Sequence, residues 1–100
     1  MLIESHRNGE TLTVKAEGQI DILGAPKFEK AVKGDLEGVK ELIIDLAGAE
    51  YVSSAGLRVI LTAAKLMKKQ GTIKVIHVPP SVMDVFRFTG MTKILDIRQV

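Results

Sequence analysis

Alternating hydrophobic and polar residues predict two strands at the start of the chain. Between residues 12 and 17, Leu, Val and Ala alternate with polar residues, which is the period of a strand with one solvated face. Residues 2–6 are its expected hairpin partner, because Asn8-Gly9 is a strong signal for a tight turn. We therefore expect an N-terminal hairpin whose second strand ends at Gly18.

The next segments read as a helix and a buried strand. Apolar residues at roughly helical spacing follow Ala25-Pro26 and continue to Leu36, with Gly38 as a plausible stop. The nearly continuous apolar run 42–46 is typical of a central strand that is buried on both faces. The small residues 47–50 are expected to form a loop.

The longest predicted helix runs from Ser53 to Gln70. Its expected apolar face comprises Leu57, Ile60, Leu61, Ala64 and Met67. A strand is predicted over 72–78, and Pro79-Pro80 breaks it and starts a short helix through Phe88.

Strands that alternate with helices predict an α/β fold with a mixed, partly parallel sheet. We expect about four to five strands covered by about three to four helices, in the order β-β-α-β-α-β-α with a short tail. A chain of 100 residues is predicted to form a single domain, 1–100.

Composition excludes several classes of protein. Hydrophobic residues make up 46% and charged residues 26%, with a formal net charge of +2, as in ordinary globular proteins. Cysteine is absent and the two histidines are far apart in sequence, so we expect no metal site and no cofactor. Neither a basic, aromatic nucleic-acid surface nor a membrane-spanning run is visible. We expect a cytoplasmic protein without a signal peptide.

Residues 51–58, Tyr-Val-Ser-Ser-Ala-Gly-Leu-Arg, carry the most informative chemistry. They follow a buried strand and open the longest helix, so a hydroxyl pair lies at the free N–H groups and the positive end of the helix dipole. A phosphate on Ser54 would be stabilised there, and Arg58 is one turn away. Ala55 and Gly56 leave room for a partner's backbone.

Two other interpretations of these serines remain open. Serines at helix starts are usually caps, each contributing about 1 kcal/mol. Ser54 and Gly56 also match the end of the G-x-S-x-G pattern of serine hydrolases, but Val52 stands where the first glycine is needed. Neither histidine has an evident carboxylate partner, and a chain this short has little wall for a pocket. We therefore expect no enzyme and no catalytic residue.

Several blocks of the sequence follow one family pattern in order and spacing. Gly-Gln-Ile-Asp at 18–21 is similar to G-x-(I/L)-D, and 42–46 ends in Asp-Leu. Residues 51–61 are similar to the signature (Y/F)-(M/V)-D-S-(S/A)-G-L-x-V-L, and glycine and apolar positions between 71 and 94 fit the remaining pattern. The chain thus resembles the STAS domain family over nearly its whole length, and within it the stand-alone anti-sigma-factor antagonists of bacteria.

The resemblance implies regulation by partner switching. In this family the unphosphorylated antagonist binds an anti-sigma factor, which frees the sigma factor. The anti-sigma factor is also a serine kinase that phosphorylates the antagonist, and a metal-dependent serine phosphatase reverses this. The resemblance places the phosphorylated residue at Ser54. The partner-binding residues that we expect are Asp21, Ser53, Ser54, Ala55, Gly56, Leu57 and Arg58.

One position departs from the family pattern. Ser53 stands where the family has an aspartate beside the phosphorylated serine, which removes a negative charge and adds a second hydroxyl. The alternative is therefore a non-phosphorylated STAS interaction subunit of another signalling or transporter-associated complex. Asp21 has two interpretations, a loop-capping carboxylate and a partner contact. The sequence leaves the sigma factor and the oligomeric state open.

Overall fold

Strands and helices alternate along the chain in the computed structural model, which describes residues 2–34 and 36–100. The elements are β1 (Leu2–Asn8), β2 (Thr11–Ile20), α1 (Ala25–Lys33), β3 (Glu41–Asp45), β4 (Ala49–Val52), α2 (Ser54–Met67), β5 (Thr72–Ile76), α3 (Pro80–Phe88), the 3₁₀ helix η1 (Met91–Lys93) and β6 (Asp96–Ile97). No helix in the described ranges has the length and apolar character needed to cross a membrane.

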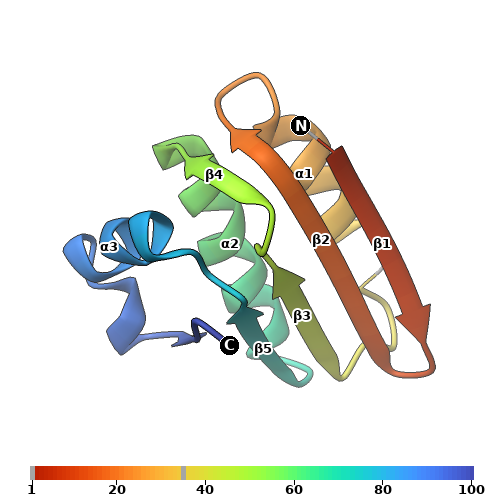
Figure 1. Cartoon of the computed structure of the whole chain (residues 1–100). Coiled ribbons are helices and arrows are strands. Elements are labelled where there is room, and N and C mark those ends of the chain that lie inside the picture. The colour runs from red at the N-terminus through yellow and green to blue at the C-terminus, as the bar shows by residue number, and fades with distance from the viewer. Residues whose placement is uncertain (1, 35) are drawn as a thin grey trace.

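The strands form one mixed sheet in the order β1-β2-β3-β5-β6, and β4 lies beside the end of β2 (Figure 1). β1 is antiparallel to β2, whereas β2, β3, β5 and β6 are parallel to their successive neighbours. The predicted α/β class and mixed sheet are confirmed. The short strands β4 and β6 add to the four longer strands that the pattern predicted.

Helices α1 and α2 lie against one face of the sheet, and the opposite face faces the viewer in Figure 1. Leu42 and Ile44 of β3 are fully buried towards the helices, while Ile43 between them is only partly buried. The expectation that this strand is buried on both faces is therefore wrong. The apolar run alone does not reveal that both long helices pack on the same side.

Strand β2 changes partner along its length. Thr11–Lys15 pairs with β3, whereas Gly18–Ile20 pairs with β4, and the register shifts directly after Gly18. Gly18 has a φ of +85°, a conformation that favours glycine, and its N–H donates to the carbonyl of Gly48 at 2.9 Å. The predicted end at Gly18 and the predicted loop 47–50 are wrong, because β2 continues and β4 begins at Ala49.

The two long helices differ from their predicted outlines. α1 ends at Lys33 rather than near Leu36, with Gly34 as its C-terminal cap, and Leu36 is buried beyond the helix. The buried face of α2 consists of Gly56, Val59, Ile60, Ala63 and Met67. Three residues of the expected apolar face are only partly buried: Leu57, Leu61 and Ala64. The helix instead turns Gly56 and Ala63 towards the core, and at Gly56 it packs directly against the sheet.

The side chain of Gln70 connects the end of α2 to the segment before β3. Its amide N–H groups donate to the carbonyls of Leu36 and Val39.

We predict that Gln70→Ala lowers the free energy of unfolding by about 1–3 kcal/mol, because two partly buried carbonyls lose their donor. Urea denaturation measures this change. In the matched control Lys69→Ala, a side chain without a hydrogen bond among the described residues is removed, and we expect a change below about 0.5 kcal/mol. Equal losses of unfolding free energy in both variants would contradict a stabilising role for the hydrogen bonds of Gln70.

Candidate functional site

The parallel pairing of β2 and β4 brings two distant segments together. Ile20 is in register with Val52, and the N–H of Ser53 donates to the carbonyl of Ile20 at 2.8 Å. The loop that begins at Asp21 therefore lies beside the start of α2 (Figure 1). The sheet thus assembles the region that contains the predicted partner-binding residues.

The two adjacent serines have different roles. Ser53 is the N-cap of α2: its backbone is extended, and its Oγ accepts a hydrogen bond from the N–H of Gly56 at 3.3 Å. Ser54 is the first helical residue, is exposed, and has no side-chain hydrogen bond within the described residues. The capping interpretation therefore applies to Ser53, and the hydroxyl of Ser54 is free.

Gly56 is buried on the inner side of the first turn of α2. A Cβ atom at this position would lie 2.8 Å from Cγ2 of Ile20 and 3.1 Å from Cγ1 of Val52. The space that the glycine leaves is therefore occupied by the sheet, and the expectation that it admits a partner's backbone is wrong. Ala55 is partly exposed at the surface, whereas Leu57 is partly buried and packs against the core.

Asp21 organises the loop between β2 and α1. Its Oδ1 accepts hydrogen bonds from the N–H groups of Leu23 at 3.1 Å and Gly24 at 3.0 Å. Its carbonyl also accepts from the N–H of Ala25 at 2.9 Å. This geometry supports the loop-capping interpretation. A direct contact between Asp21 and a partner stays a prediction.

Two exposed aliphatic side chains lie in the same loop, and they are not among the residues predicted from the sequence. Ile22 is 75% exposed and Leu23 is 87% exposed. A shallow hollow of about 300 Å³ is lined by Ile22, Ala55 and Arg58, among others. Exposed apolar side chains that cluster at one place mark interaction surfaces. A signal was present: two large aliphatic residues directly follow Asp21, at positions that neither a strand nor a helix period explains.

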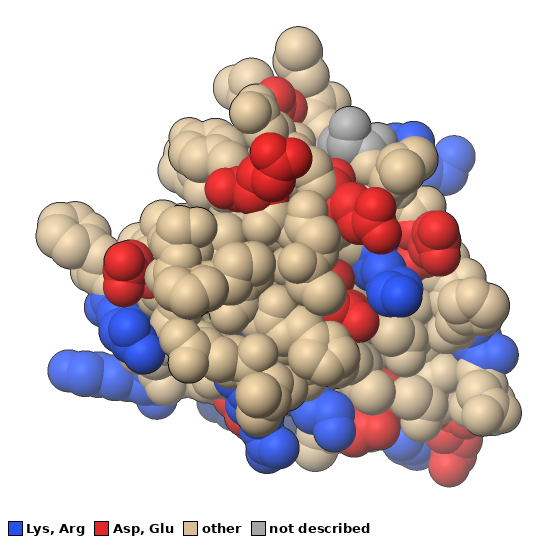
Figure 2. Space-filling model, viewed as in Figure 1, with Lys and Arg blue, Asp and Glu red and all other residues tan. Residues whose placement is uncertain are grey.

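Arg58 is exposed on the second turn of α2, and its side chain makes no ion pair within the described residues. On the open face, Figure 2 shows acidic side chains over β4 and the end of β2. The exposed carboxylates of these two strands are Glu17 and Glu50. This part of the surface is opposite in charge to one that binds a nucleic-acid backbone.

A histidine–carboxylate pair lies elsewhere in the molecule. Nδ1 of His77 is 3.1 Å from Oδ1 of Asp45, which also accepts from the N–H of Ala47 at 3.0 Å. A histidine thus has a carboxylate partner that the sequence did not reveal. Asp45 ends β3 and His77 directly follows β5, whereas Ser54 begins α2. Figure 1 shows the end of β5 and the start of α2 well apart. The pair therefore does not activate the hydroxyl of Ser54.

Replacing Gly56 tests the close approach of α2 to the sheet. We predict that Gly56→Ala destabilises the protein by about 1–3 kcal/mol, because the new methyl group overlaps buried Ile20 and Val52. The gain in helix propensity, about 1 kcal/mol, would act in the opposite direction. The predicted loss of about 1–3 kcal/mol is the net of these two effects. Thermal and urea unfolding measure this net change in the free energy of unfolding. Ser54→Ala, an exposed change in the same turn, is the control and leaves stability within about 0.5 kcal/mol. A stabilised Gly56→Ala variant would overturn the packing assignment.

The sequence is similar to a known family of domains and to several known proteins. A family model described as "Mlab, STAS domain" matches residues 3–97. The putative anti-sigma factor antagonist BtrV of Bordetella bronchiseptica is 30% identical over 83 residues, which cover 81% of this chain and 72% of that protein. The anti-sigma-B factor antagonist of Bacillus subtilis is 29% identical over 96 residues, which cover 95% of this chain and 88% of that protein.

A solved structure has the same fold. The crystal structure of an anti-sigma factor antagonist from Mycobacterium paratuberculosis superimposes with a TM-score of 0.90 at 22% identity. The match covers 99% of this chain and 86% of that one. The match to the family model over 3–97 confirms the resemblance found in the sequence, and the chain belongs to the STAS domain family.

Proposed function

We propose that this protein is an anti-sigma-factor antagonist that acts by partner switching in the cytoplasm. Unphosphorylated, it binds an anti-sigma factor that is also a serine kinase, and phosphorylation of Ser54 ends this binding. A serine phosphatase returns it to the binding state. The names of the relatives from Bordetella bronchiseptica and Bacillus subtilis support this assignment. The protein itself acts as a binding partner and not as an enzyme.

The free hydroxyl of Ser54 carries the proposal. A kinase needs an accessible acceptor, and Ser54 is exposed without a competing hydrogen bond in the described part of the chain. The neighbouring hydroxyl of Ser53 is only partly exposed and is used to cap α2. This difference supports Ser54 rather than Ser53 as the acceptor.

A phosphate on Ser54 is compatible with the fold. It adds about −1.5 to −2 charges at the positive end of α2. The first turn of this helix contains no acidic residue, and Arg58 follows one turn later without an ion pair among the described residues. The local electrostatics therefore favour the phosphorylated state, and the switch acts on the interface rather than on folding.

The exposed apolar side chains explain how the interface would respond. Ile22 and Ala55 line one hollow at the start of α2, and Leu23 is exposed in the same loop. Ser54 directly precedes Ala55, so we infer that a partner that covers these side chains also displaces water from the hydroxyl of Ser54. Desolvating a phosphate dianion against an apolar contact costs far more than desolvating a hydroxyl. Phosphorylation therefore weakens binding through a local change.

Ser53 in place of the family's aspartate favours one alternative. In it, the protein is a non-phosphorylated STAS interaction subunit of another signalling or transporter-associated complex. The same loop and the same start of α2 would form its contact. The two functions differ in the partner and in whether Ser54 receives a phosphate, and the phosphate can be measured directly.

Intact-mass measurement distinguishes these functions. After incubation with the cognate anti-sigma-factor kinase and ATP, we expect the wild-type protein to gain one phosphate and Ser54→Ala to gain none. The control Ser81→Ala removes another exposed serine from the first turn of a helix, and it should still gain one phosphate. An unmodified wild-type protein would support the alternative instead.

A phosphate mimic separates binding from stability. We predict that Ser54→Asp changes the free energy of unfolding by less than about 1 kcal/mol, because an acidic residue suits a helix N-terminus. The same variant should bind the kinase at least about tenfold more weakly, as calorimetric titration measures. Ser81→Asp, which makes the same change in α3, should bind like the wild type. Undiminished binding by Ser54→Asp would contradict the proposed switch.

A further inference from the structure

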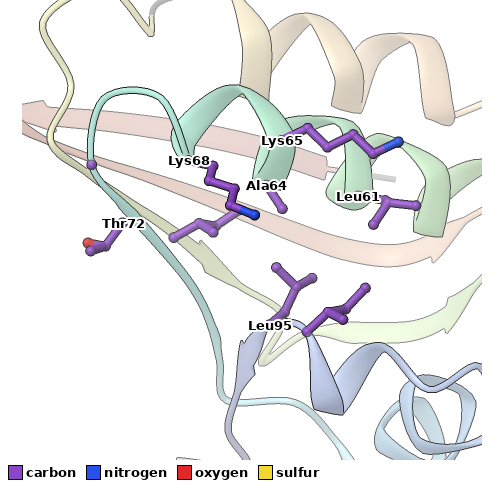
Figure 3. Close-up of a pocket in the computed structure, with 9 residues that line it drawn as sticks. Leu61, Ala64, Lys65, Lys68, Thr72 and Leu95 are labelled. Atoms are coloured by element: carbon purple, nitrogen blue, oxygen red, sulfur yellow. The ribbon is translucent and has the colours of Figure 1, made fainter.

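A groove lies at the opposite end of α2 from Ser54, between the second half of this helix, β5 and residues 94–95 (Figure 3). We call it the α2–β5 groove. Its volume is about 450 Å³, within the range of about 300–1,000 Å³ that is usual for ligand pockets. Its apolar wall consists of Leu61, Ala64, Ile73, Ile94 and Leu95.

The groove exposes part of an apolar surface that the fold leaves uncovered. Leu61 and Ala64 belong to the apolar stripe of α2, but the helix is rotated so that both are only partly buried. Ile94, on the opposite wall, is 64% exposed. All the apolar lining is aliphatic, and none of the described lining residues is aromatic or carries a side-chain amide. Such a wall suits a hydrocarbon chain and not a nucleotide base.

Two lysines give the groove a positive charge. Lys65 and Lys68 both line it, both are exposed, and neither makes an ion pair within the described residues. Lys74 on β5, by contrast, is paired with Glu41 at 3.4 Å. No described carboxylate lines the groove. Figure 3 shows Lys68 reaching over the groove towards Leu95, while Lys65 extends along the helix.

The surface around the groove carries charges of both signs. Figure 2 shows basic and acidic side chains along the lower margin of the molecule, where α2 ends and β5 begins in Figure 1. The attraction for an anion therefore comes from the two lysines that line the groove, and it acts at short range.

We propose that the α2–β5 groove binds an anionic amphiphile with a single aliphatic chain, of the long-chain carboxylate class. The chain packs against the aliphatic wall, and the carboxylate accepts hydrogen bonds from the ammonium of Lys68. An acidic amphipathic helix of a partner protein would need an apolar row that extends over several helical turns. The groove is instead one hollow with a charge at its margin, which favours the amphiphile.

This site is separate from the proposed switch. Ser54 and Lys68 lie at opposite ends of α2, about 20 Å apart along its axis at 1.5 Å per residue. A ligand in the α2–β5 groove therefore leaves the loop at Asp21 and the start of α2 uncovered. The inference does not depend on phosphorylation of Ser54.

A titration of the isotope-labelled full chain with sodium decanoate, followed by amide NMR, tests the site. We expect saturable shifts at Leu61, Ala64, Ile73 and Leu95, and none at Ser54. Acetate tests the head group alone, and decyltrimethylammonium tests the same chain with the opposite charge. Both should bind at least about tenfold more weakly than decanoate.

Three variants locate the ligand. Lys68→Glu should weaken decanoate binding at least about tenfold, whereas Lys69→Glu, the same charge change on a residue that does not line the groove, should leave it nearly unchanged. Ala64→Leu should weaken binding by filling the groove. Urea denaturation of each variant checks that the fold is retained.

Several results would overturn the proposal. These are the absence of shifts at the groove, equal affinity for decyltrimethylammonium, and equal losses in the two lysine variants. Saturable binding at the groove by an acidic amphipathic peptide, without binding of decanoate, would replace the ligand by a protein partner. None of these outcomes affects the mass measurement on Ser54. The proposed function and the proposed ligand site are therefore tested independently.

Discussion

The pairing of β4 with the end of β2 is the constraint on which the site depends. The hydrogen bond from the N–H of Ser53 to the carbonyl of Ile20, 2.8 Å long, sets the point at which the chain leaves the sheet and enters α2. Gly56 lets the first turn of the helix lie directly on Ile20 and Val52. Backbone pairing and close packing together hold the free hydroxyl of Ser54 beside the loop that Asp21 caps. If residues 49–52 did not pair with β2, the start of α2 and the loop at Asp21 would not be held side by side.

Helix α2 connects two chemically different surfaces. Its N-terminus combines free N–H groups and the positive end of the dipole with an exposed hydroxyl and the aliphatic residues Ile22 and Leu23. Its C-terminal half carries Lys65 and Lys68 beside an aliphatic groove. In both places the fold leaves apolar surface uncovered next to a site that favours negative charge. The first surface is the proposed regulated protein contact, and the second is the proposed site of a small amphiphilic ligand.

Much of the site could be predicted because its signals are local. The N-cap at Ser53 and the start of α2 follow from residue types within one helical turn, and the structure places both there. The family signature in 51–61 covers the same turn. Three of the wrong predictions concern β4, the end of β2 and the room beside Gly56. Each depends on a partner some thirty residues away along the chain, so no local period reports it. The pairing of His77 with Asp45 was missed for the same reason.

The sequence by itself determined the class of fold, the order of the longer elements, the family and the serine pair at the start of α2. Hydrophobic periodicity and capping chemistry act between near neighbours, which is why they can be read without a structure. Only the tertiary structure decided which serine is free, which face of α2 is buried, and that Leu61 and Ala64 line a groove. These outcomes depend on how closely the helix approaches the sheet, and that distance is set by packing between residues far apart in the chain.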